Sequence, residues 1–399
     1  MKIEELFESK LELNKGILEK AERLIGEIFE SLGSIESMET LFESDNPFAN
    51  SKYYEYCGSD SMELKVSKKG QGPDAIDKNK NVWELKCLGP RQRNLSFSFQ
   101  KVGDKFEELE ESLFKKDEKE PFNSGKLSGR LLACRKLPLK EGFGFSEMIE
   151  CDMKDVWDKL LRDKMEEDFE DGTKFSSPVD YKKIKKMIED GEISGKVYNR
   201  EQIKEKLEKN CPEEKKSLYN KLDELLKLFS DAVCVEEGEL GLKFKKGVNP
   251  LNKNDLNEFR AAVYTDSLML GGNGPDAINK NLEYLEFKVL GGAKSARLDW
   301  GSVPDSWDTF LTDKVTKKFM WKNDKSIRYY IFKRKGQKFT DCYMAEGSEL
   351  LGDKEIVKRI ETSYNTIGER KTKKLYLSLS FLNNPLFKNV KLEDLLNIA

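Results

Sequence analysis

The chain contains the same short phrase twice, and this internal repeat constrains the fold more than any other feature. Residues 72–89 and 274–291 align without a gap and share 11 of 18 positions, where chance would give roughly one. Each copy reads Gly-Pro-Asp-Ala-Ile, then a polar turn, then an apolar run that ends in Leu-Gly. The repeat predicts two similar lobes in one chain.

Each copy keeps an Asp, a Glu and a Lys in fixed register. They are Asp74, Glu84 and Lys86 in the first copy and Asp276, Glu286 and Lys288 in the second. The pattern predicts two short strands joined by a hairpin-like turn, which places the Glu and the Lys on one face with the Asp nearby. Two carboxylates suit a magnesium-type ion, and the lysine can orient or deprotonate a water and stabilise charge on a phosphate. Phosphodiester hydrolysis needs these parts.

At these residues the chain resembles the PD-(D/E)XK nuclease superfamily, which has the restriction-endonuclease-like fold. The resemblance rests on Pro73-Asp74, Glu84 and Lys86 and on Pro275-Asp276, Glu286 and Lys288. It implies that the Asp and Glu side chains bind a divalent metal and that the Lys positions or activates the attacking water. It also implies an α/β (α+β) fold with two lobes, each a mixed central β-sheet flanked by helices, related by internal duplication. The alternative is that these residues are solvated charges of two hairpins.

The repeat extends upstream to an acidic residue in each half. Asn46-Pro47-Phe48 precedes Glu55 by the same distance as Asn249-Pro250-Leu251 precedes Glu258. Nucleases of this superfamily often have an acidic residue on a helix before the metal-binding strand. The resemblance therefore implies that Glu55 and Glu258 complete the metal shells. Alternatively, both are ordinary exposed helix glutamates.

The order of predicted elements also corresponds between the halves. A Lys-, Glu- and Leu-rich stretch, predicted as a helical hairpin, precedes each motif at residues 3–32 and 203–229. After each motif we expect a helix (106–116; 305–321), a strand (130–137; 327–333), another strand and a helix (155–169; 354–364). The duplication boundary falls near Arg200, which gives a first nuclease lobe at 1–200 and a second at 201–399, each of ordinary domain size.

The absence of histidine excludes many mechanisms. No triad with an imidazole base, no histidine-dependent nuclease site and no His-ligated zinc site can form in this chain. A phosphate-binding Gly-x-x-x-x-Gly-Lys-[Ser/Thr] motif is also missing, so no nucleotide cofactor is expected. The seven cysteines lack any Cys-x-x-Cys pair, which favours reduced thiols.

Basic residues follow each motif at a distance that suits contacts with DNA. The chain carries a formal net charge of −3, yet its 70 Lys and Arg residues can form a local basic cleft. The candidates are Arg91, Arg93 and Lys101 in the first half and Lys294 and Arg297 in the second. Alternatively, they belong to solvated loops. Phe97 and Phe99 alternate with serines, so we expect them in the core rather than stacked on bases.

No apolar run approaches the length of a transmembrane helix, and the N-terminus is not a secretory signal, so we expect a cytoplasmic protein without membrane contact. The predicted function is a metal-dependent endodeoxyribonuclease that cuts duplex DNA, using Mg²⁺ with Mn²⁺ as a substitute. A type II-like restriction enzyme acting as an intrachain pseudo-dimer, with one active site per strand, fits best. We expect a monomer with an internal pseudo-twofold axis, and further dimerisation is left open.

Two alternatives remain at this level. One is a structure-selective or RNA-directed nuclease, because the superfamily also contains repair, junction-resolving and RNA-cleaving members. The other is a nucleic-acid-binding regulatory protein in which one or both sites are inert.

Overall fold

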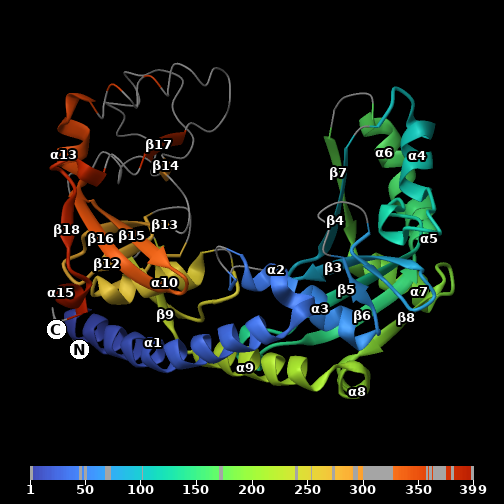
Figure 1. Cartoon of the computed structure of the whole chain (residues 1–399), viewed down its shortest axis with the longest axis horizontal. Helices are drawn as coiled ribbons and strands as arrows, with labels where there is room; N and C mark the ends of the chain where they lie inside the picture. Colours follow the sequence, from blue (N-terminus) through green and yellow to red (C-terminus); the bar gives the residue numbers. More distant parts are fainter. Residues whose placement is uncertain are drawn as a thin grey trace. The chain divides into compact units, whose positions relative to one another are not determined.

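The computed structural model has a mixed α/β architecture in which helices accompany mixed and antiparallel sheets (Figure 1). This confirms the expected α+β class. The structure describes residues 3–44, 47–48, 52–67, 73–100, 102–169, 174–238, 241–252, 254–271, 275–290, 295–299, 327–355, 358, 362, 374–378 and 382–396. None of the helices within these ranges is long and apolar enough to cross a membrane.

The chain forms two compact units that interleave along the sequence. The first-motif unit contains Leu24–Glu43 and Asn50–Lys227, and the second-motif unit contains Met1–Arg23, Ser44–Ala49 and Leu228–Ala399. The predicted boundary between residues 200 and 201 separates the two copies of the repeat, and it stays a prediction. The compact units have other bounds, because the helical stretch before each motif belongs largely or partly to the unit that carries the other motif.

The first-motif unit is built on a six-stranded sheet with the order β1-β2-β3-β5-β6-β8. Its strands are β1 (Lys65–Val66), β2 (Ala75–Ile76), β3 (Val82–Leu88), β5 (Arg130–Lys136), β6 (Phe145–Asp152) and β8 (Gly195–Asn199). Only β3 and β5 are parallel among these described neighbours. Because β3 lies inside the sheet, its first four residues are buried, which explains its apolar run.

The second-motif unit contains a sheet of the same plan, with the order β11-β12-β13-β15-β16-β18. Its strands are β11 (Ser267–Met269), β12 (Ala277–Asn279), β13 (Tyr284–Leu290), β15 (Arg328–Lys335), β16 (Lys338–Glu346) and β18 (Lys388–Val390). Here β13 and β15 form the parallel pair. The pairing of each parallel partner with the next strand also shifts in register, at Arg135/Lys136 between β5 and β6 and at Lys333/Arg334 between β15 and β16.

Three two-stranded ribbons accompany these sheets within the described ranges. They pair β4 (Asn94–Gln100) with β7 (Lys174–Asp180), β14 (Ser295–Asp299) with β17 (Lys374–Ser378), and β9 (Val233–Gly238) with β10 (Gly241–Lys246). In β4 the side chains of Phe97 and Phe99 are buried, while Ser96 and Ser98 are exposed. The expectation that both aromatic residues belong to the core is confirmed.

One prediction about the helices is wrong. Residues 3–32 do not form a helical hairpin but belong to a single helix, α1 (Ile3–Ser34). No proline interrupts this stretch, and its two glycines cost only about 1 kcal/mol each relative to alanine. Buried side chains recur along α1 at helical spacing and outweigh that cost: Phe7, Leu11, Leu18, Ala21, Ile25, Ile28 and Leu32.

The second helical stretch does divide in two. Helix α8 (Arg200–Asn210) ends before Pro212, and α9 (Glu213–Phe229) follows it. A residue that precedes proline disfavours the helical conformation, so Cys211 is extended. Further helical segments of the described residues are η1 (Glu36–Met38), α2 (Glu39–Phe42), α3 (Lys52–Ser61), η2 (Pro121–Asn123), η3 (Leu139–Glu141), α7 (Tyr181–Glu189), α10 (Asp255–Tyr264), α13 (Gly347–Gly352) and α15 (Leu392–Leu396).

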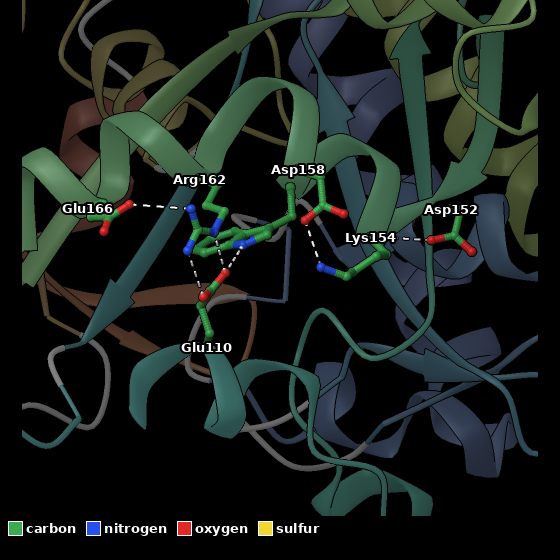
Figure 2. Close-up of polar contacts among 7 residues, drawn as sticks. Glu110, Asp152, Lys154, Asp158, Arg162 and Glu166 are labelled. Atoms are coloured by element: carbon green, nitrogen blue, oxygen red, sulfur yellow. Dashed lines mark hydrogen bonds and ion pairs between the residues drawn. The ribbon is translucent and has the colours of Figure 1, made fainter. Parts of the chain in front are cut away.

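The elements expected after the first motif are present. Helix α4 (Phe106–Phe114) and the continuous run of α5 (Met153–Val156), the π-helical turn η4 (Trp157–Leu161) and α6 (Arg162–Phe169) pack on one core with β4 and β5. Figure 2 shows the Glu110 carboxylate of α4 facing the Arg162 guanidinium of α6, with Nε to Oε1 at 3.0 Å. The indole of Trp157 donates to the same oxygen at 2.7 Å. The helix expected at 305–321 lies outside the described residues, and that at 354–364 is described only in part.

Candidate active sites

A tight hairpin places the first carboxylate beside the central strand. Asp77 Oδ1 accepts the backbone N–H groups of Asn79 and Asn81, and Lys80 has a positive φ of 64°. This Asx-type turn reverses the chain between β2 and β3. Asp74, just before β2, then donates its N–H to Trp83 O at 3.0 Å and accepts the N–H of Leu85 on Oδ2 at 2.8 Å. The carboxylate is therefore fixed by backbone bonds rather than by a mobile loop.

The second copy is built in the same way. Asn279 replaces Asp77 as the acceptor for the turn, and Leu282 has a positive φ of 62°. Asp276 donates its N–H to Leu285 O at 3.0 Å and accepts the N–H of Phe287 on Oδ2 at 2.6 Å. The structure therefore confirms the hairpin expected from both copies.

The Glu and Lys of each motif form a direct pair on the central strand. Lys86 Nζ donates to Glu84 Oε1 at 2.6 Å, and Lys288 Nζ donates to Glu286 Oε1 at 2.8 Å. Both glutamates are buried, with 3% and 6% of their surface exposed. In each, Oε2 is buried and has no hydrogen-bond partner among the described residues. A buried carboxylate oxygen without a partner is costly, so a bound cation would stabilise it.

Burial raises the pKa of one carboxyl in each Asp–Glu pair. The pKa of Glu84 rises to about 7, because burial and the charge of Asp74 outweigh the opposing charge of Lys86. In the second site, burial and the charge of Glu286 raise the pKa of Asp276 well above its usual range. Two neighbouring buried carboxyl groups resist ionising together, and a cation between them would remove this penalty.

The two lysines keep their protons in this environment. Burial by itself lowers the pKa of Lys86, but the charge and hydrogen bond of Glu84, with the charges of Asp74 and Glu55, raise it overall. Lys288 has a raised pKa for the same reasons, with Glu286, Asp276 and Glu258 as the anions. An ammonium with a raised pKa is a poor base but a good donor. This favours the role of orienting a water and stabilising charge over that of deprotonating it.

The upstream glutamates lie on helices, as expected: Glu55 on α3 and Glu258 on α10. Both are half-buried rather than exposed. The pKa of Glu55 is raised by burial and by the charge of Asp74, and that of Glu258 rises to about 7 through burial and the charges of Asp255 and Glu286. Each glutamate also interacts with the lysine of its own motif. The reading as ordinary exposed helix glutamates is therefore wrong.

Both helices are held by long-range ion pairs that were not expected from the sequence, one buried and one partly exposed. Asp60 of α3 accepts Lys215 Nζ at 2.7 Å and the Tyr219 hydroxyl at 2.6 Å, both from α9. Arg260 of α10 donates from Nε to Glu22 Oε1 of α1 at 2.7 Å. No local motif signals these pairs, because their members are 155 and 238 residues apart. They fix the helices that carry Glu55 and Glu258.

The proposed DNA-contacting residues are only partly described. Arg91 and Arg93 are exposed on the loop between β3 and β4. Arg135 holds this loop by donating from Nη1 to Gln92 O at 2.9 Å. Lys101 and Lys294 lie outside the described residues. Arg297 lies in β14, but its side chain is not described.

Two further cations reach the first site. Lys126 is half-buried, and its charge lowers the pKa of Glu84. The charge of Lys136, at the end of β5, lowers the pKa of Glu55. A signal for the second was present in the sequence, because a basic pair, Arg135-Lys136, closes the apolar β5 and a second pair, Lys333-Arg334, lies in the corresponding stretch of β15.

The donor set suits magnesium better than a metal that needs a complete protein cage. No group of three or more His, Cys, Asp or Glu side chains within the described chain is arranged to hold a metal ion. Magnesium usually takes one or two carboxylates and keeps waters and substrate phosphates as its other ligands. Asp74 with Glu84 and Asp276 with Glu286 offer two such carboxylates each, and each glutamate has an unpartnered oxygen.

No protein-family model matches the chain, and no curated protein matches it either.

Proposed function

We propose that this protein is a magnesium-dependent endonuclease that hydrolyses duplex DNA, with one active site in each unit. The observation that carries the proposal is the double occurrence of one arrangement. In each unit a backbone-fixed Asp lies beside a buried Glu–Lys pair, and one oxygen of that Glu has no partner among the described residues. Structural ion pairs alone give no reason to leave a buried carboxylate oxygen unpartnered twice.

The residues of each site have separate tasks. Asp74 and Glu84, or Asp276 and Glu286, would hold Mg²⁺, with Glu55 or Glu258 at the edge of the shell. When bound, the ion would supply charge neutralisation at the phosphate and a water of lowered pKa. Lys86 and Lys288, kept protonated by their carboxylates, would donate a hydrogen bond to the attacking water and stabilise negative charge as it develops on the phosphate.

The matching sheets support the internal duplication and the restriction-endonuclease-like lobes. Both sheets have the same strand order, the same single parallel pair and a register shift between the same two strands. Each is a mixed sheet accompanied by helices, as the resemblance to PD-(D/E)XK nucleases implies. Two such sites in one chain suit a type II-like restriction enzyme, because each site would cut one strand.

The test is cleavage of supercoiled plasmid by the purified full-length chain, followed by sequencing of the DNA ends. We expect linear product in Mg²⁺ or Mn²⁺, none in excess EDTA, and binding with little cutting in Ca²⁺. The double variant Lys86→Ala/Lys288→Ala, purified identically, controls for contaminating nucleases. Discrete ends would support sequence-specific cutting, whereas random ends, or cleavage of RNA instead, would favour the other nuclease classes. Binding without cleavage in either metal would refute the enzymatic proposal.

A further inference from the structure

The last residue of β5 is a lysine that the proposed chemistry does not yet use. Lys136 follows the register shift that separates it from Arg135. Consecutive side chains of a strand point to opposite faces of the sheet, so the two neighbouring cations go to different places. Arg135 binds the loop that carries Arg91 and Arg93 and packs on the Tyr181 ring at 4.5 Å, whereas Lys136 extends toward helix α3.

Lys136 is held next to Glu55 without being neutralised by it. Its Nζ lies 4.1 Å from the ring centroid of Tyr54, the residue before Glu55. The ring is fixed in turn by Phe143, with centroids 4.6 Å apart. Glu55 and Lys136 affect each other's pKa, yet within the described chain no carboxylate lies within ion-pair distance of this ammonium. Burial also lowers the pKa of Lys136, so the environment penalises its charge.

The Lys136 ammonium contacts an aromatic face but no hydrogen-bond acceptor of the described chain, and at half burial it remains open to water or to an anion. A cation–π contact contributes about 0.5–2 kcal/mol and satisfies none of the N–H groups. Lys86, by contrast, is bonded to Glu84 of the same site. An anion from outside the chain would complete the environment of Lys136.

The second unit has a cation at the corresponding place. Arg334 follows the register shift of β15 as Lys136 follows that of β5. Counted from the first parallel pair, Trp83–Arg130 and Leu285–Arg328, both residues are the seventh of the strand parallel to the catalytic one. The aromatic neighbour is not repeated, because Asn257 stands before Glu258 where Tyr54 stands before Glu55. The feature common to both units is the cation.

We propose that Lys136 and Arg334 each bind a backbone phosphate of the nucleic acid next to the one that is cut. The inference rests on the proposed function and extends it. In the first unit, Lys136 and the exposed Arg91 and Arg93 follow the carboxyl ends of the two parallel strands. These cations would hold the strand so that the scissile phosphate reaches Glu84 and Lys86.

The test is the salt dependence of DNA binding by the full-length protein. A random-sequence duplex oligonucleotide is titrated in Ca²⁺ over a range of salt concentrations. Loss of one phosphate contact reduces the slope of log K against log[salt] by about 0.9. We expect this reduction for Lys136→Gln, twice the reduction for Lys136→Gln/Arg334→Gln, and a wild-type slope for Lys136→Arg. The matched control is Lys140→Gln, which removes the same charge from an exposed residue.

The outcomes separate this inference from the proposed function. A wild-type slope for Lys136→Gln, in a protein that binds and cuts DNA, overturns the inference alone, even if cutting slows, because a residue that only positions Glu55 leaves the slope unchanged. An equal change in Lys140→Gln also overturns it, because the effect is then one of net charge. If the wild-type chain binds no duplex, the proposed function fails together with the inference. Thermal unfolding checks that each variant is folded, and Lys136→Arg guards against a packing defect.

Discussion

The two sites share their strand geometry but differ in the ion pair that holds the helix carrying the upstream glutamate. In the first-motif unit, α3 presents a buried acid, Asp60, to a lysine and a tyrosine of α9. In the second-motif unit, α10 presents a buried base, Arg260, to a glutamate of α1. The helix thus supplies the acidic partner of the ion pair in one unit and the basic partner in the other, although Glu55 and Glu258 occupy the same place on the two helices. The motif and the ion pair that holds the neighbouring helix are therefore independent of each other, and only the motif is repeated in the sequence.

The comparison also shows which positions are free to differ. The helix that carries Glu55 continues as Tyr56-Cys57-Gly58-Ser59-Asp60, and that of Glu258 as Phe259-Arg260-Ala261-Ala262-Val263. Both helices nevertheless end alike, because Glu63 and Asp266 have positive φ values of 56° and 47° just beyond them. The two helices therefore share their backbone geometry, although the side chains that face the neighbouring helix differ. The part of each helix that carries the glutamate matters for the site, and the rest of the helix matters for packing.

The largest expected effect concerns whether the two sites divide the strands between them. Lys86→Ala should remove charge stabilisation from the first site only, and Lys288→Ala from the second only. Loss of one donor that stabilises charge in the transition state costs about 10²- to 10³-fold in its own step. Each single variant should therefore convert supercoiled plasmid to open circles, and the double variant should leave it supercoiled. Strand-specific end labelling would show opposite strands nicked by the two variants.

Unequal behaviour would break the symmetry between the sites. If Lys86→Ala linearises plasmid at the wild-type rate while Lys288→Ala is inactive, the first unit serves recognition and not cleavage. Lys86→Arg and Lys288→Arg serve as matched variants, since they keep the positive charge but change the geometry of the donor.

The next largest effect concerns the two anchors. Asp60→Ala leaves Lys215 buried without its carboxylate, and breaking such a pair costs about 3–5 kcal/mol. The Lys215 and Asp60 side chains are only 10% and 8% exposed. Glu22→Ala should cost less, about 1–3 kcal/mol, because Glu22 is 39% exposed and water can replace it beside Arg260. Hydrogen exchange of peptides from α3 and α10 would measure each local opening free energy.

The anchors should act on their own units. We expect Asp60→Ala to speed exchange in α3 and Glu22→Ala to speed exchange in α10. Equal losses for both variants, or a loss confined to the wrong helix, would contradict the proposed difference. Glu19→Ala, an exposed change on the same helix as Glu22, is the control for α1.

The smallest predicted effect is the pH dependence of the metal-free sites. The pKa of Glu84 is about 7 in the folded chain against an ordinary value of 4.5. Its protonated form favours folding, so this stabilisation is complete below pH 4.5 and is lost as the pH rises to about 7. In EDTA, the wild type should lose on the order of 2 kcal/mol relative to Glu84→Gln between pH 5 and pH 8. Denaturant unfolding at several pH values would measure it.

The second site should respond through its aspartate. Because the pKa of Asp276 is raised, the wild type should lose stability relative to Asp276→Asn in the same direction as the pH rises. Glu63→Gln, which changes an exposed carboxylate, is the control. A wild type that gains stability relative to either site variant over this range would contradict the predicted sign of the pH dependence.

Much of each site follows from the sequence because its parts are local. The turn chemistry of Asp77 and Asn279, the alternation that pairs Glu84 with Lys86, and the burial of β3 all lie within the 18-residue repeat. Short-range backbone geometry determines them, so spacing alone predicted the hairpins. The helices that carry Glu55 and Glu258 were expected from the resemblance to PD-(D/E)XK nucleases instead.

Tertiary structure alone decided how these parts are held and charged. The sequence suggested a hairpin over 3–32, but long-range packing of Phe7 and Leu11 on Val235 and Leu268 favours one continuous helix α1. The Asp60–Lys215 and Arg260–Glu22 pairs join residues too distant for any local pattern to link. Burial, which sets the pKa of Glu84 and Asp276 and leaves Lys136 without an anion, depends on every element packed around the site. Spacing along the chain determines which groups can meet, whereas desolvation depends on the whole fold.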